Sequence, residues 1–181
     1  MSSPLERDVA HLGDDWCSFR SDAIAGSARA RKRYEGAANV IAADEMPFEK
    51  SPDGLIKHLI NERMDSKECC IEAYMQFLPP QGRSGRHRHM WEEVLFVLEG
   101  SGHDLHWDLK FDCIDKFEYE WEPSPKRYEW QRGDFIYVPP FSIHQHHNDG
   151  DSEARLIVIS NRIVKTMGFN WLDQLEHAPG Y

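Results

Sequence analysis

Two histidines and a pair of glutamates are the residues of this chain best suited to chemistry. His87 and His89 are separated by one residue, and Glu92 and Glu93 follow directly after Met90-Trp91. Later in the chain, the segment Gly133–Pro140 leads to His144. Neutral imidazole nitrogens together with one carboxylate oxygen suit Fe(II), Mn(II), Ni(II) or Zn(II). The spacing therefore predicts a centre for one divalent metal ion.

Strand geometry decides which of these side chains can meet. Side chains alternate between the two faces of an extended strand, so His87 and His89 share a face. If the strand continues through Trp91, Glu93 has the same parity and Glu92 has the opposite one. Arg88 is then expected to point away from the site. We therefore expect His87, His89 and Glu93 to converge on one ion.

A second strand must deliver the last histidine. Phe135–Val138 is rich in β-forming residues and follows the turn at Gly133-Asp134. Pro139-Pro140 ends this strand, because neither residue can donate a hydrogen bond to a ladder. The chain then re-enters at Ser142-Ile143-His144 and is expected to place His144 beside the first pair.

These two segments resemble the two motifs of the cupin superfamily. The first motif, His-x-His, three residues, Glu, six residues, Gly, is matched by His87, His89, Glu93 and Gly100. The second motif, Gly, five residues, Pro, then His and Asn, is matched by Gly133, Pro139, His144 and Asn148. The sequence departs from the pattern at Phe141, where a glycine is usual, and at Gly82, which is displaced by one position. Phe141 puts the shape of the turn in doubt, but not the ligands.

The resemblance implies an all-β fold, the double-stranded β-helix or cupin jelly-roll barrel, with an N-terminal arm and short helical segments. Each motif occurs once, which predicts a single cupin domain. We expect an N-terminal arm, partly helical or extended, over residues 1–50, the barrel over 51–165, and a C-terminal segment with a short helix over 166–181. Four ligands on a six-coordinate ion would leave two positions, either for a bidentate substrate or for substrate and dioxygen side by side.

Other strands are expected at Leu55–Glu62 and around Ile71–Phe77. Val94–Leu98 and Leu156–Ile159 are apolar at every position, which is typical of strands covered on both faces. This pattern predicts either a homodimer or a sheet wrapped by another part of the chain. The charged and aromatic connection Asp112–Lys126 is too long for a tight hairpin, so it holds an extended loop or two longer strands.

The amino-acid composition limits the binding partners and the cellular location that can be expected for this protein. The net charge of −10 argues against a nucleic-acid partner, because phosphate binding needs a basic face. No apolar run is long enough to span a membrane, and the first residues lack the apolar core of a signal peptide, so a cytoplasmic location is expected. The four cysteines show no Cys-x-x-Cys spacing and are expected to be reduced thiols.

Further site residues follow from their positions beside the motifs. His146 is two residues beyond His144, so it is expected to face the same cavity, as a general base or as a hydrogen-bonding partner of a ligand. A small-molecule substrate is expected to contact an aromatic wall, although the same aromatic residues could simply be barrel core. These candidates are His106, Trp107, Tyr137 and Phe141.

Within the cupins, Ser84–His89 together with Phe96–Gly102 is similar to ring-cleaving dioxygenases of the gentisate type. Those enzymes hold iron by three histidines, so Glu93 moves the chain toward cupins that keep a fourth ligand. The first hypothesis is an Fe(II) dioxygenase that cleaves a small hydroxylated aromatic or an enolisable carbon acid. The alternatives are a redox-silent isomerase or lyase and a small-ligand binding or sensor cupin.

Overall fold

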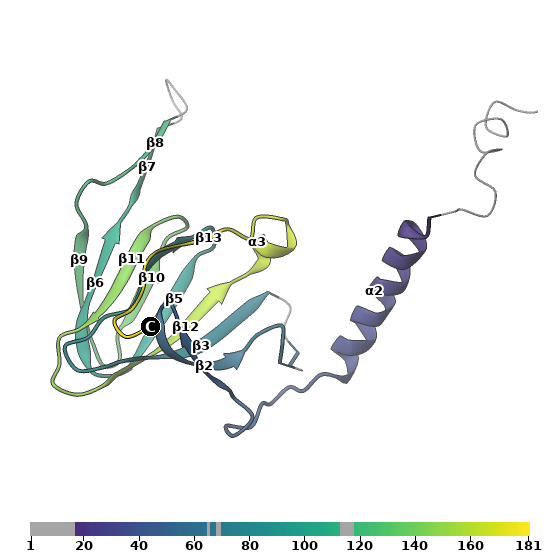
Figure 1. The fold of residues 1–181 in the computed structure, drawn as a ribbon, viewed down its shortest axis with the longest axis horizontal. Helices are drawn as coiled ribbons and strands as arrows, with labels where there is room; N and C mark the ends of the chain where they lie inside the picture. The colour runs from purple at the N-terminus through teal and green to yellow at the C-terminus, as the bar shows by residue number, and fades with distance from the viewer. Residues whose placement is uncertain (1–16, 65, 68–69, 113–117) are drawn as a thin grey trace, which may run out of the picture. The chain divides into compact units, whose positions relative to one another are not determined.

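The structure is a computed structural model that describes residues 17–64, 66–67, 70–112 and 118–181 (Figure 1). The chain divides into two units, Met1–Ala37 and Ala38–Tyr181. The described part of the first unit is essentially one helix, α2 (Phe19–Gly36), which buries none of its residues. Its alanines and arginines favour a helix over an extended arm. Among the described residues, no helix is both long and apolar enough to cross a membrane.

The second unit contains two antiparallel sheets that face each other. The larger sheet has six strands in the order β1-β2-β3-β12-β5-β10. Consecutive positions on β5 and β12 alternate between buried and more exposed, as expected where one face of a sheet covers a core. The strands are β1 (Phe48–Ser51), β2 (Gly54–Ile60), β3 (Ile71–Leu78), β12 (Ala154–Asn161), β5 (Glu93–Glu99) and β10 (Phe135–Val138).

The smaller sheet has five strands in the order β13-β4-β11-β6-β9. A separate hairpin of β7 (Leu109–Asp112) and β8 (Glu118–Trp121) follows β6 and projects beyond the other strands (Figure 1). The long connection thus contains strands, while residues 113–117 lie outside the described residues. The strands of the five-stranded sheet are β13 (Leu172–Glu176), β4 (Arg86–His89), β11 (Ile143–Asn148), β6 (Ser101–Trp107) and β9 (Lys126–Gln131).

The apolar core lies mainly against the inner face of the six-stranded sheet. Leu95, Val97, Leu156 and Val158 are completely buried there, and Trp130 contributes from β9 of the opposite sheet. The close approach of strands explains two glycines. A Cβ on Gly102 would meet the His147 carbonyl oxygen at 1.9 Å, and one on Gly100 would meet Ala154 at 2.6 Å. Gly100 also has φ of +93°, which favours glycine at this turn.

The C-terminal segment differs from the expected short helix within residues 166–181. The helix α3 (Ile163–Thr166) ends at the first residue of that range, and the tail instead forms β13, which pairs antiparallel with β4. Unpaired donors and acceptors along the edge of β4 explain the difference, because an extended tail satisfies them and a helix would not. Of the cysteines, Cys17 and Cys70 are free, while Cys69 and Cys113 lie outside the described residues.

Candidate metal centre

The three motif histidines lie together on adjacent strands of the five-stranded sheet. His87 and His89 share one face of β4, and His144 on β11 is the Cα partner of His87. The ring centroid of His144 lies 4.2 Å from that of His87 and 4.9 Å from that of His89. All three residues are at most 2% exposed. Strand alternation and one cross-strand pair thus produce the predicted cluster.

Glu93 reaches this cluster from the opposite sheet. The chain leaves β4 after His89 and starts β5 at Glu93, so Met90–Glu92 forms a break between two strands rather than a continuous one. Trp91 fills the break, and its ring stacks on His89 at 4.6 Å. Glu93 is buried and accepts a 2.8 Å hydrogen bond from the Ser160 hydroxyl, whereas Glu92 is exposed. Of the two glutamates, Glu93 therefore faces the histidines and Glu92 does not.

The outward nitrogen has a fixed hydrogen-bond acceptor in two of the motif histidines and lies beside a carboxylate in the third. His89 Nδ1 donates to the Trp91 carbonyl at 2.7 Å, and His144 Nδ1 donates to the Ser142 carbonyl at 2.9 Å. His87 Nδ1 lies 3.0 Å from an Asp53 carboxylate oxygen, an ion-pair distance at which the angular geometry of a hydrogen bond is not met. Such partners orient imidazole rings that bind metals.

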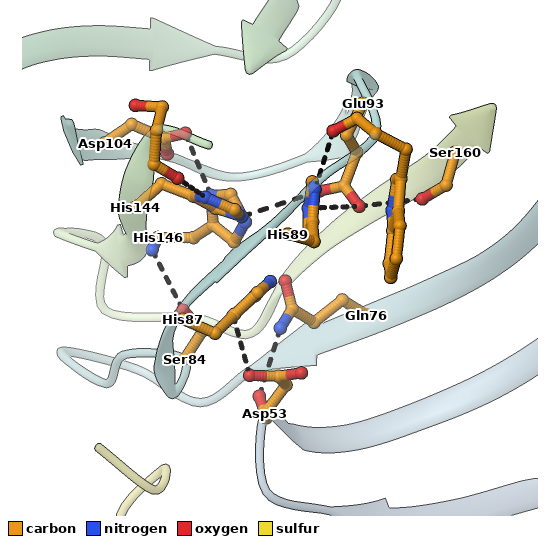
Figure 2. A network of polar contacts seen from close by, with 12 residues as sticks. Asp53, Gln76, Ser84, His87, His89, Glu93, Asp104, His144, His146 and Ser160 are labelled. Atoms are coloured by element: carbon orange, nitrogen blue, oxygen red, sulfur yellow. Dashed lines mark hydrogen bonds and ion pairs between the residues drawn. The ribbon is translucent and has the colours of Figure 1, made fainter. Parts of the chain in front are cut away.

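The inward atoms of the cluster are buried and lack hydrogen-bond partners. These atoms include His89 Nε2, Glu93 Oε1 and His144 Nε2. His89 Nε2 lies 3.5 Å from Glu93 Oε2, and His144 Nε2 lies 3.9 Å from Glu93 Oε1 (Figure 2). Burying a polar atom without a partner is costly unless it is compensated. Converging nitrogen and carboxylate donors of this kind fit a divalent metal ion.

The electrostatics keep these groups in the protonation states that a metal requires. Burial by itself raises the pKa of Glu93, but His89 together with His87 and His146 outweighs burial and lowers it. Burial lowers the pKa of His144 well below its usual value, and the nearby His87 and His89 lower it further. A carboxylate and a neutral imidazole are the ligating forms of these side chains.

His146 faces the same interior, as expected from its parity with His144. Its Nδ1 donates to Asp104 Oδ2 at 2.9 Å, and Trp130 Nε1 donates to Asp104 Oδ1 at 2.8 Å. His106 Nε2 contacts the same carboxylate at 3.3 Å. Burial by itself lowers the pKa of His146, but Asp104 outweighs burial and raises it. His106 therefore contacts Asp104, the carboxylate that also binds His146, and lies beside the cluster.

The three aromatic candidates do not form a wall around the site. Tyr137 is 54% exposed, because it alternates with the buried Ile136 and Val138 and therefore lies on the outer face of β10. Trp107 stands on the opposite face of β6 from His106 and packs under the Arg86 guanidinium. Phe141 packs against Trp171 outside the cluster. Strand parity explains the first two of these corrections.

The backbone at Phe141 shows how the chain accommodates this departure from the cupin pattern. Its φ of +65° lies in the left-handed region, where glycine is usual and a phenylalanine is strained. Its backbone N–H donates to the His89 carbonyl at 2.8 Å, and its carbonyl accepts from Trp121 Nε1 at 3.1 Å. The turn therefore keeps its conformation and still delivers His144, as the ligand pattern requires.

Sequence reasoning missed the residues that support the cluster from a distance. Asp53 lies in the turn between β1 and β2, and Gln174 of β13 donates to it at 2.9 Å. Although burial raises the pKa of Asp53, its contacts with His87 and Gln174 outweigh burial and lower it. The Pro52-Asp53-Gly54 turn was visible in the sequence, but nothing there connects it with His87 or with Gln174.

Comparisons with known proteins agree with this fold. Solved structures with similar folds include a Bacillus subtilis oxalate decarboxylase variant, with a TM-score of 0.57, 14% identity, and 77% of this chain and 33% of that chain covered. A second Bacillus subtilis oxalate decarboxylase, which has Mn(II) centres, gives a TM-score of 0.54 and 16% identity over 73% of this chain and 30% of that one.

A third similar structure is the capsular polysaccharide assembling protein CapF from Staphylococcus aureus. Its TM-score is 0.50, with 16% identity over 72% of this chain and 34% of that chain. The chain therefore spans about a third of the length of these structures. At such low identity these likenesses concern the fold alone. A comparison with curated protein sequences found no match.

A family model described as Auxin binding protein matches residues 36–176. This match includes every strand of the two sheets and all four residues of the candidate metal centre. The chain therefore belongs to the auxin binding protein family, a germin-like branch of the cupin superfamily.

Proposed function

We propose that this protein is a metal-dependent cupin enzyme that acts on a small molecule. His87, His89, Glu93 and His144 would hold one divalent ion. The observation that carries the proposal is the set of buried, unpartnered donor atoms contributed by both sheets. Their burial is costly without an ion, and their chemistry matches the ligands of Fe(II), Mn(II), Ni(II) and Zn(II).

The residues around the ligands would fix the geometry of the site. The carbonyl groups of Trp91 and Ser142 hold the rings of His89 and His144, and Ser160 holds one oxygen of Glu93. The four ligand residues are almost completely buried and therefore shielded from bulk water. When bound, the ion would act as a Lewis acid or, as Fe(II), would supply electrons to dioxygen.

The specific reaction that we propose is oxidation by an Fe(II) dioxygenase of a small hydroxylated aromatic or an enolisable carbon acid. The mixed histidine and carboxylate ligand set supports it, since such sets occur in oxygen-activating iron enzymes. The second candidate is a redox-silent isomerase or lyase. The His146–Asp104 pair favours it, because an oriented imidazole beside the cluster could move a proton.

A third candidate is a cupin that binds a small ligand without turnover. The description of the family as auxin binding proteins supports this candidate. It predicts saturable binding of an auxin to the metal-loaded protein and no product. Binding and turnover can therefore be separated in one set of measurements.

The test is to purify the protein without added metal and to load it separately with Fe(II), Mn(II) and Zn(II). Oxygen uptake is then followed with catechols, hydroquinones and β-diketones, and auxin binding is followed by calorimetry. His87→Ala is the inactive variant, and Arg88→Ala is the matched control, because the Arg88 side chain points away from the cluster and pairs with Asp173.

Oxygen uptake that disappears in His87→Ala but persists in Arg88→Ala would support the dioxygenase. Turnover that needs metal but consumes no oxygen would favour the isomerase or lyase. Auxin binding without turnover would favour the binding cupin. A protein that holds no divalent metal under any of these conditions would refute the proposal.

A further inference from the structure

His146 shares the hydrogen-bonding arrangement of two motif histidines. In His89, His144 and His146 alike, Nδ1 is bonded to a fixed acceptor, while Nε2 is buried and has no partner. His146 is 1% exposed, and its ligand atom lies within 4.8 Å of those of Glu93 and His144. Nothing in these features separates His146 from a residue that binds the ion.

The neighbouring histidines of the same sheet are different. His106 directs its Nε2 at Asp104, and His147 directs its Nε2 at Gln145 Oε1, 3.2 Å away. The ring of His103 stacks on His147, and its Nδ1 binds Asp149. None of these three rings has a nitrogen that is both buried and without a hydrogen-bond partner. Among the histidines that the structure describes outside the motif, His146 alone adds a buried nitrogen without a hydrogen-bond partner.

The position of His146 is fixed on two sides. Its backbone N–H donates to the Ser84 hydroxyl and its carbonyl accepts from the Ser84 backbone, both at 2.9 Å. On the other side, the Nδ1 of His146 binds Asp104 (Figure 2), which is completely buried and accepts a hydrogen bond from Trp130. A carboxylate that accepts Nδ1–H and leaves Nε2 free is the usual support of a metal-binding histidine.

We propose that His146 is a fifth protein ligand of the ion, through Nε2, in addition to the four residues of the cupin motif. This inference rests on the proposed metal-dependent function. On a six-coordinate ion, five protein ligands leave one open position instead of two. The ion would then accept one oxygen of a substrate, as from a carboxylate, and a chelating diol would not fit without the release of His146.

The competing interpretation is a protonated His146 that lies between two carboxylates. Asp104 and Glu93 would then stabilise the positive charge of the imidazolium, and its protonated Nε2 would not bind the ion. Asp53 also faces this interior, and Tyr74 lies nearby on β3. The two interpretations predict different numbers of open metal positions, which can be counted directly.

The experiment uses the full chain loaded with Mn(II). Electron paramagnetic resonance in oxygen-17-enriched water counts the exchangeable waters on the ion through line broadening, and titration gives the Kd for Mn(II). The variants are His146→Ala, Asp104→Asn and the control His147→Ala. His147 is next in sequence, but it faces the other side of the strand.

We expect one exchangeable water in the wild type and two in His146→Ala. We also expect the Kd to rise on the order of 100-fold in His146→Ala and on the order of 10-fold in Asp104→Asn, since partners of metal ligands matter less than the ligands. His147→Ala should behave as the wild type. Circular dichroism confirms that each variant is folded.

Two waters in the wild type would overturn the inference, and this measurement does not depend on the folding of any variant. A His146→Ala variant that binds Mn(II) as tightly as His147→Ala would overturn it as well. Both outcomes leave the metal-dependent function intact. A wild type that binds no Mn(II), Fe(II) or Zn(II) would instead refute the proposed function itself.

Discussion

The inner faces of the two sheets differ in chemistry, although both are almost completely buried. The six-stranded sheet presents aliphatic side chains such as Leu95, Leu156 and Val158. The five-stranded sheet presents His87, His144 and other polar side chains at the same depth. Aliphatic burial stabilises the fold directly, whereas buried imidazoles stabilise it only when they are paired or bound to a metal.

Glu93 and Ser160 are two polar residues of the six-stranded sheet that join the two faces. They are Cα partners near the ends of β5 and β12 in the six-stranded sheet, and they turn a polar pair toward the histidines. The barrel is therefore divided into a dry part and a ligand-binding part. This division can be tested by perturbing each part separately.

The largest loss of stability is expected in the dry part. Leu95→Ala removes a completely buried side chain and should lower the free energy of unfolding by about 2–5 kcal/mol. Urea denaturation measures this, with the half-exposed Leu55→Ala as the control. The folded fraction of Leu95→Ala should still bind one metal ion. A loss of binding in the folded fraction would contradict the division.

The ligand-binding part should depend on the ion. Saturation with Mn(II) at 100 times its Kd should stabilise the wild type by about 2.7 kcal/mol, because the ion binds only the folded state. Glu93→Gln keeps the size of the side chain but removes its charge, so it should lose most of this stabilisation. Thermal unfolding with and without metal measures the difference. An equal gain in both proteins would show that Glu93 is not a ligand.

The outer face of the six-stranded sheet bears on the expected homodimer, which stays a prediction. Phe135 is 70% exposed, and its ring packs on that of Phe96. Phe135, Phe96, Ile157 and Met75 are successive cross-strand partners, so they form an apolar row across four strands of this sheet. A stable dimer buries about 800 Å² on each partner, and a face of six strands can supply this area.

If a second copy of the chain binds this face, a charged side chain placed in the apolar row should prevent the dimer from forming. Phe135→Lys should shift the protein from dimer to monomer in size-exclusion chromatography with light scattering. Leu175→Lys, on β13 of the other sheet, is the matched control and should leave the mass unchanged. A wild type that is monomeric at every concentration would refute the dimer.

The smallest effect is expected at the edge of the five-stranded sheet. Hydrogen bonds from Trp171 and then from Arg88 lower the pKa of Asp173 below its usual value of 3.8. The folded state therefore favours the carboxylate, so this contribution is present above pH 3.8 and is lost as the pH falls through the lowered pKa.

Asp173→Asn should accordingly lower the Tm slightly at pH 7, and the difference from the wild type should vanish in acid. Glu153→Gln, on an exposed loop, is the control for a general loss of negative charge. A difference in Tm that stays constant from pH 7 to pH 3 would show that the Asp173 carboxylate does not stabilise β13.

The resemblance of the two motifs to those of cupins implied the barrel. Strand alternation and motif spacing predicted the convergence of His87, His89, Glu93 and His144. Glu93 faces the histidines although the strand does not continue through Trp91. The break there moves the chain from one sheet to the other and keeps Glu93 inside. Alternation alone could not place Tyr137 or Trp107, because which face of their strands is inner depends on the opposite sheet.

By itself, the sequence determined which residue types meet and on which strands, since periodicity and turn residues act locally. Only the tertiary structure decided what surrounds them. Asp53 and Gln174 reach the site from opposite ends of the barrel domain, Asp104 fixes His146, and the tail becomes a strand because β4 offers a free edge. These contacts join segments distant in the chain, and no local pattern specifies such pairings.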